Sequence, residues 1–126
     1  MNTELKPLIW STINPFGNSV QLKESTFNQH IVTENNRTEF SGEEKTLKQL
    51  AEHPRFISRD KEYSERVVYG NSYNLAKLGG VHWVSLVVDI SVQPNDVVTA
   101  IAMRKIPKIE TVNIIYDSNR TNESKI

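Results

Sequence analysis

The side chain best suited to proton transfer in this chain is the imidazole of His30, because histidine titrates near neutral pH. Two segments lead into it, Asn14–Leu22 and Glu24–Ile31. A turn, a short alternating strand and the start of a helix would together place one imidazole near the beginning of that helix. Two interpretations stay open at this point, a catalytic histidine and a half-buried structural one.

Several other side chains would suit cleavage of a phosphodiester without a metal. Such cleavage needs a base for the attacking hydroxyl, an acid for the leaving oxygen, and cations or hydroxyl donors near the phosphorus. His30 could act as the acid or the base. Basic groups could clamp the phosphate, and strand hydroxyls could donate to it; the candidates are Arg66, Arg104, Lys105, Thr99 and Tyr69.

Each of these candidates also has a purely structural interpretation. Arg66 could pair with a carboxylate across a sheet, and Thr99 is of a type common in strands. Arg59 and its basic neighbours could bind an RNA backbone. The acidic residues interspersed with them dilute the positive charge and favour a solvated loop instead.

The composition limits what the protein can be. A chain of 126 residues is long enough for one domain with a real core and too short for two. Its 15 basic and 15 acidic residues predict no strong overall attraction to nucleic acid, so any RNA function would need a local basic patch. The absence of cysteine excludes disulfides and thiolate metal sites.

No strong catalytic or cofactor motif is present in the sequence. It lacks a phosphate loop, an HExxH helix, paired cysteines and a GxSxG elbow. The three histidines have no metal-ligand spacing, so we expect neither a metal nor a cofactor. No apolar stretch is long enough to span a membrane, and the first residues lack the order of a signal peptide. We therefore expect a cytoplasmic protein without a membrane partner.

The elements that would position the candidate residues follow from turn and periodicity signals. A hairpin-like turn at residues 14–18 has Gly17 at its positive φ. One helix is predicted from Ser25 or Thr26 to about Asn35, and a second one ends near His53, before Pro54. Gly70 opens a predicted turn at residues 70–72. The predicted strands are Trp10–Ile13, Val20–Leu22, Arg55–Ser58, Arg66–Tyr69, Val81–Ile90, Val97–Met103 and Thr111–Tyr116.

Helices followed by a run of strands are typical of an α+β fold. We predict an N-terminal hairpin and two helices packed on one face of a four- to five-stranded antiparallel sheet. Residues 1–118 would form a single domain and residues 119–126 a flexible polar tail. The strand Val81–Ile90 has apolar residues on both faces, which predicts a central position in the sheet.

Four segments of the chain carry a resemblance when they are taken in order. They follow the patterns turn-glycine, strand and aromatic-x-x-His-Ile, then Pro-x-x-Ile, then Arg-x-x-Tyr, then Val-x-Thr-Ala. Together they resemble the phage-associated branch of the barnase–EndoU–colicin–RelE-like (BECR) nuclease superfamily, over residues 10 to about 117. The matching segments are residues 14–31, His53–Ile57, Arg66–Tyr69 and Val97–Ile101.

The resemblance implies a barnase-like fold and a metal-independent ribonuclease, with His30 as the catalytic histidine and Arg66 and Thr99 at the site. Many relatives carry a second histidine where this chain has Glu34 and Asn35. Glu34 is one helical turn from His30 and could orient it or replace the missing base.

The resemblance also implies a bacterial or phage source and a role as a prophage-encoded toxin or effector. Its partners would be RNA, including tRNA, and an immunity protein or a phage structural protein. The alternative is a catalytically inactive binding module of the same fold, which the neutral net charge favours. A third interpretation is a small-molecule enzyme that uses His30 with a carboxylate.

Overall fold

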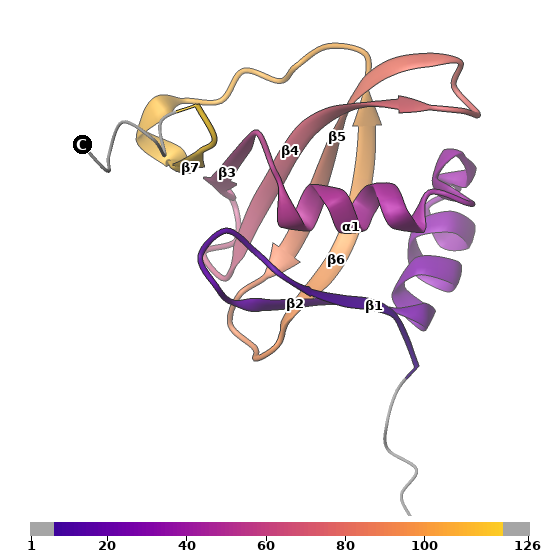
Figure 1. Ribbon diagram of the computed structural model, residues 1–126, viewed down its shortest axis with the longest axis horizontal. Helices are drawn as coiled ribbons and strands as arrows, with labels where there is room; N and C mark the ends of the chain where they lie inside the picture. The colour runs from indigo at the N-terminus through magenta and orange to yellow at the C-terminus, as the bar shows by residue number, and fades with distance from the viewer. Residues whose placement is uncertain (1–6, 120–126) are drawn as a thin grey trace, which may run out of the picture.

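The computed structural model describes residues 7–119. All the strands in this part of the chain pair into one sheet (Figure 1). The spatial order is β1-β2-β6-β5-β4-β3-β7. All neighbouring strands are antiparallel except β2 and β6, which run parallel. The strands are β1 (Leu8–Ile13), β2 (Ser19–Lys23), β3 (Phe56–Arg59), β4 (Arg66–Leu75), β5 (Gly80–Asp89), β6 (Asn95–Met103) and β7 (Ile114–Asp117).

The sheet curls around helix α1, which touches β1 on one side and β4 and β5 on the other (Figure 1). The Trp10 indole of β1 donates a hydrogen bond of 2.9 Å to the Glu44 carbonyl at the start of α1. A second helix, η1, packs against β6 and β2 and has π-helical winding. The helical segments are η1 (Thr26–Glu34), η2 (Thr38–Phe40), α1 (Glu44–Glu52) and η3 (Thr111–Asn113).

The predicted four- to five-stranded antiparallel sheet is wrong in both strand number and pairing. The sheet has seven strands and is mixed, because the N-terminal hairpin joins it instead of packing on it. Val20 and Gln21 pair in parallel with Asn95 and Asp96 of β6. Alternation of apolar residues identifies a strand but carries no information on which strand it pairs with, so this parallel contact left no local signal.

The predicted turn after Tyr69 is also wrong, since β4 continues through Gly70 to Leu75. Gly70 is a strand residue there because the indole of Trp83, on β5, lies over it in place of a side chain. Other local expectations are confirmed: Gly17 has a φ of +83°, and α1 ends at Glu52 with His53 following it. Most of the predicted C-terminal tail, residues 120–126, lies outside the described residues.

The core lies between the sheet and the layer formed by α1 and η1. Alternate residues of β4 and β5 are buried on this side, and the helices contribute their own apolar faces. No helix within residues 7–119 has both the length and the apolar composition needed to cross a membrane. The buried residues of this side include Val67, Tyr69, Leu75, Val84, Leu86, Val88, Phe27, Ile31, Leu47 and Leu50.

We predict that Gly70→Ala lowers the free energy of unfolding by about 1–3 kcal/mol, because the new Cβ forces the Trp83 ring to move. That Cβ would lie within 3.0 Å of three atoms of the ring. Urea unfolding of the purified protein measures the effect. Gly80→Ala is the matched control, since a Cβ there meets no atom within 4 Å. Equal unfolding midpoints for the two variants would contradict the close packing.

Candidate functional site

The sheet face opposite α1 is apolar as well, and it carries the candidate site. In β4 and β5, the residues between the core positions point to this second face. Paired residues Val68 and Val87 lie side by side on it, as do Gly70 and Ser85. Trp83 and Ile101 extend the same surface along β5 and onto β6.

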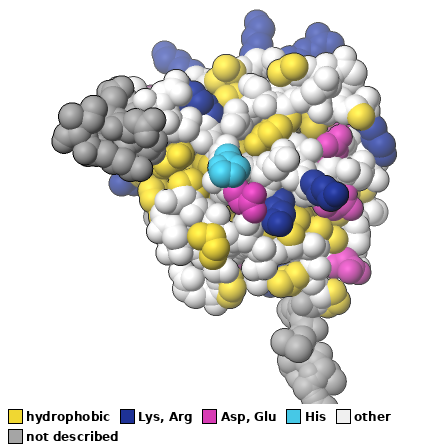
Figure 2. Space-filling model, in the orientation of Figure 1, with side chains coloured by type: hydrophobic (Ala, Val, Ile, Leu, Met, Phe, Trp, Pro, Cys, Tyr) yellow, Lys and Arg dark blue, Asp and Glu magenta, His cyan; other side chains and the backbone are white. Residues whose placement is uncertain are grey.

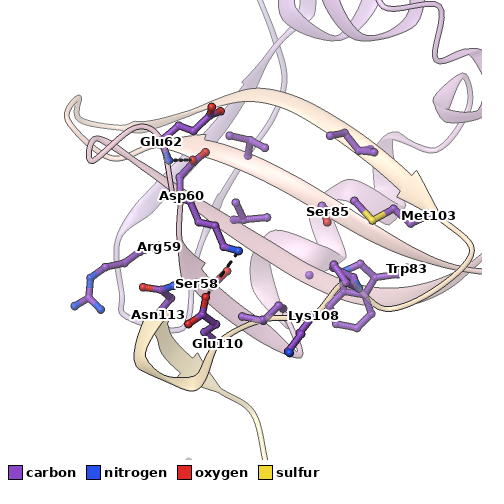
Figure 3. Close-up of a pocket in the computed structure, with 17 residues that line it drawn as sticks. Ser58, Arg59, Asp60, Glu62, Trp83, Ser85, Met103, Lys108, Glu110 and Asn113 are labelled. Atoms are coloured by element: carbon purple, nitrogen blue, oxygen red, sulfur yellow. Dashed lines mark hydrogen bonds and ion pairs between the residues drawn. The ribbon is translucent and has the colours of Figure 1, made fainter.

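The chain that follows β6 crosses this face and turns the surface into a groove. Residues 104–113 run from the end of β6 to η3 and β7, as the orange to yellow ribbon of Figure 1 shows. Pro107, Lys108, Ile109 and Glu110 line the groove from that side. The groove has a volume of about 550 Å³, which is within the range of small-molecule sites. Figure 3 shows its lining residues.

Trp83 forms the wall at one end of the groove. Its ring covers Gly70 and lies 6.1 Å, between centroids, from the ring of Phe56 on β3. Met103 is its partner on β6, so both side chains stand where β5 begins and β6 ends. Val87 is four residues further along β5. Since a strand rises about 3.3 Å per residue, the backbone positions of Trp83 and Val87 are roughly 13 Å apart.

Two serine hydroxyls lie on the otherwise apolar floor of the groove. Ser58 of β3 and Ser85 of β5 are 7% and 4% exposed, and both line the groove. Neither hydroxyl forms a hydrogen bond within residues 7–119, and neither oxygen is fully cut off from solvent. These two are therefore available to a molecule in the groove.

Charged residues of both signs surround the other end of the groove, where β3 leads into β4. The Lys61 ammonium lies 4.0 Å from the Glu110 carboxylate, across the groove (Figure 3). Asp60 accepts a hydrogen bond of 2.8 Å from the Glu62 amide, which fixes the turn. Arg59 donates one of 3.4 Å to the Val112 carbonyl. At this end the charges largely balance.

The predicted catalytic pair lies on the other side of the sheet, on η1. The His30 Nδ1 and the Glu34 Oε1 are 2.9 Å apart, and the side chains are 49% and 64% exposed. Phe27 and Ile31 bury the opposite side of that helix in the core. The contact predicted between His30 and Glu34 is therefore present, at the surface and away from the groove.

The structure does not bring Arg66 and Arg104 together. In the strand register, Arg66 of β4 lies opposite Asp89 at the end of β5. Arg104 comes directly after Met103 of β6, which lies opposite Trp83 near the start of β5. Asp89 and Trp83 are six residues apart along β5, or about 20 Å. Arg66 instead lies over the Tyr63 ring, 4.2 Å from its centroid. A single phosphate cannot contact both guanidinium groups.

The two predicted hydroxyl donors have structural partners. Thr99 accepts a hydrogen bond of 2.7 Å from Arg37, which also donates one of 2.7 Å to the Ala100 carbonyl. Tyr69 is 1% exposed and accepts a hydrogen bond of 2.9 Å from the Asn14 amide. Burial raises the pKa of the Tyr69 hydroxyl, and the Asn14 hydrogen bond offsets part of that rise.

Of the predicted binding residues, only Arg59 lines the groove, while Arg104 and Lys105 are exposed just beyond Met103. Sequence reasoning missed the floor of the groove and the role of Arg37. A signal for the floor was present, since the strand that became β5 is apolar on both faces. The sequence did not reveal that the segment after β6 folds back over the second face.

Comparison of the chain with protein-family models, with curated proteins and with solved structures finds no match in any of the three. No group of three or more histidine or acidic side chains among residues 7–119 is arranged to hold a metal ion. The site must be interpreted from its own chemistry.

We predict that Tyr69→Phe destabilises the protein by about 1–3 kcal/mol, because the buried Asn14 amide loses its acceptor. Asn14 also accepts hydrogen bonds from the Phe16 and Asn18 amides at 3.0 and 2.9 Å, so the change loosens the hairpin turn. Urea unfolding of the purified variant measures the loss. Tyr63→Phe, at a residue 46% exposed, is the control with no expected effect. Stability equal to that of the unchanged protein would exclude this role for Tyr69.

Proposed function

We propose that this chain is a binding module whose groove, on the sheet face opposite α1, holds a small and largely apolar molecule. The observation that carries the proposal is the cavity of about 550 Å³ with an apolar floor and two hydroxyls that lack protein partners. Binding sites for small molecules commonly combine a mostly apolar lining with a few polar groups that orient the ligand. The apolar lining is the floor of Val68, Val87, Ile101 and Met103. The polar groups that orient the ligand are Ser58 and Ser85.

The lining favours binding over catalysis. None of its 17 residues is a histidine or a cysteine. No base within residues 7–119 accepts a hydrogen bond from Ser58 or Ser85, and an unactivated hydroxyl is a weak nucleophile. The groove can therefore select a ligand by shape and hydrogen bonding, with no group prepared to break a bond in it.

We predict that the neutral fluorophore N-phenyl-1-naphthylamine binds the protein at one saturable site. Val87→Lys should weaken that binding about tenfold, because it places a cation on the apolar floor. Fluorescence titration gives the dissociation constants. Val92→Lys is the matched control, since Val92 is 44% exposed in the β5–β6 turn and does not line the groove.

A second variant, Val68→Lys, tests the same surface from β4, next to Val87. Circular dichroism and urea unfolding establish that each variant folds, which is expected because a lysine at a groove can extend its ammonium to water. Equal affinities for the Val87 and Val92 variants would refute the groove as the binding site.

A second function, metal-independent cleavage of RNA, is favoured by the contact between His30 and Glu34. A carboxylate on Nδ1 fixes the imidazole so that Nε2 can exchange a proton with a substrate. Both side chains are half-exposed or more, so RNA could reach them. Under this proposal the chain would be a nuclease of the BECR type, from a bacterium or a phage, and act as a toxin or effector.

We predict for this second function that the protein degrades tRNA or total RNA in the presence of EDTA and that His30→Ala abolishes the cleavage. Glu34→Gln should lower the rate at neutral pH by about tenfold or more, since it removes the charge that orients and supports the imidazolium. Gel electrophoresis of the RNA measures both effects. Thr33→Ala, at a neighbouring helix position, serves as the control. Cleavage that survives in the His30 variant, or no cleavage by the unchanged protein, would reject the nuclease.

A further inference from the structure

One basic side chain that lines the groove, Lys108, has no acidic partner in the described part of the chain. It belongs to the segment Arg104–Lys108, which follows directly from Met103 and contains two further basic residues, Arg104 and Lys105, that are exposed and do not line the cavity. None of the three forms an ion pair with another residue in the described part of the chain. Figure 2 shows Lys and Arg side chains along the upper edge of the molecule, in a view from the α1 side in which the groove faces away.

The opposite end of the groove is close to neutral. There Arg59 and Lys61 stand beside Asp60 and Glu62, and Lys61 faces Glu110 across the groove. Figure 3 shows Lys108 and Trp83 toward one end of the cavity, and Asp60 and Glu62 toward the other. On the apolar floor between these ends, the backbone positions of Trp83 and Val87 are roughly 13 Å apart. The groove is therefore apolar along its floor, with balanced charges at the Asp60 end and the single lining cation Lys108 toward the Trp83 end.

From this arrangement we propose that the ligand is a small carboxylic acid with an apolar body. Its body lies on the floor between Val87 and Trp83, and its carboxylate lies at the Arg104–Lys108 end. This inference rests on the proposed binding function and adds to it the charge of the ligand and its orientation in the groove. Ammonium and guanidinium groups at the rim would stay hydrated and still attract an anion, at the modest strength typical of exposed ion pairs.

The cationic end also explains why a neutral apolar molecule is the poorer occupant. An uncharged ligand of the same length would leave Lys108 and its neighbours without a counter-charge, and a cationic ligand would meet repulsion there. Electrostatic complementarity thus discriminates among ligands of the same apolar length, to which the floor alone would give the same affinity.

Competition against bound N-phenyl-1-naphthylamine tests the proposal with three probes of equal chain length: decanoate, 1-decanol and decylamine. At pH 7 and low salt, decanoate should bind about threefold to tenfold more tightly than decanol, and decylamine more weakly than both. Salt at 0.5 M should remove most of the advantage of decanoate and leave decanol unchanged, because exposed charges are screened.

Lys105→Gln/Lys108→Gln should abolish the preference for decanoate and keep the affinity for decanol. Lys45→Gln/Lys48→Gln is the matched control, with the same loss of charge on α1, beyond the sheet from the groove. It should retain the full preference for decanoate. A preference lost equally in both double variants would overturn the assignment to the Arg104–Lys108 end.

The outcomes separate this inference from the proposed function. If decanol and decanoate bind equally, the inference about charge is wrong and the binding module stands. If N-phenyl-1-naphthylamine does not bind at all, the proposed function fails and the inference fails with it. Self-association of the protein that excludes the fluorophore, measured by sedimentation velocity, would assign the groove to a second copy and overturn the proposal.

Discussion

The central strand β5 has apolar side chains on both faces, and both faces of the sheet must therefore be kept from water. Within residues 7–119 the two longer helices cover only one of them. α1 and η1 pack on the side of Leu86, whereas the side of Val87 has only the short η3 at its margin. Trp83 and the segment 104–113 cover that second side in part. The groove is the portion of the apolar face that this thinner cover leaves open.

Polar contacts hold the sheet together where strand pairing is short. The β2–β6 ladder has only two residue pairs, and the ion pair between Lys23 and Asp96, at 2.8 Å, stands beside it. Arg37 donates a hydrogen bond to the Ala100 carbonyl of β6 and ties β6 to the chain that follows η1. A role of this kind for Arg37 explains why Thr99 is occupied and is not offered to a substrate.

The sequence predicted local elements well and their assembly poorly. Every predicted strand corresponds to an observed one, and the ends of the hairpin turn and of α1 followed from Gly17 and Pro54. These signals depend on neighbours in the chain. The parallel pairing of Val20 with Asn95 depends on residues far apart in sequence, and so does the packing of Trp83 over Gly70. Without that partner, Gly70 indicates a turn; with it, Gly70 is the position in β4 where no side chain fits.

The same distinction applies to the site. Histidine, arginine and threonine were chosen as site residues for their chemistry. The type of a residue does not show how far it lies from another residue in the fold, and the register of β5 puts Arg66 and Arg104 about 20 Å apart along the strand. The neutral net charge was equally uninformative, because it sums 15 basic and 15 acidic residues over the whole chain and says nothing of where each charge lies. The pair of His30 and Glu34 lies on η1, on the other side of the sheet. The two proposals, binding in the groove and proton transfer at His30, thus concern separate surfaces, and a test of one carries no consequence for the other.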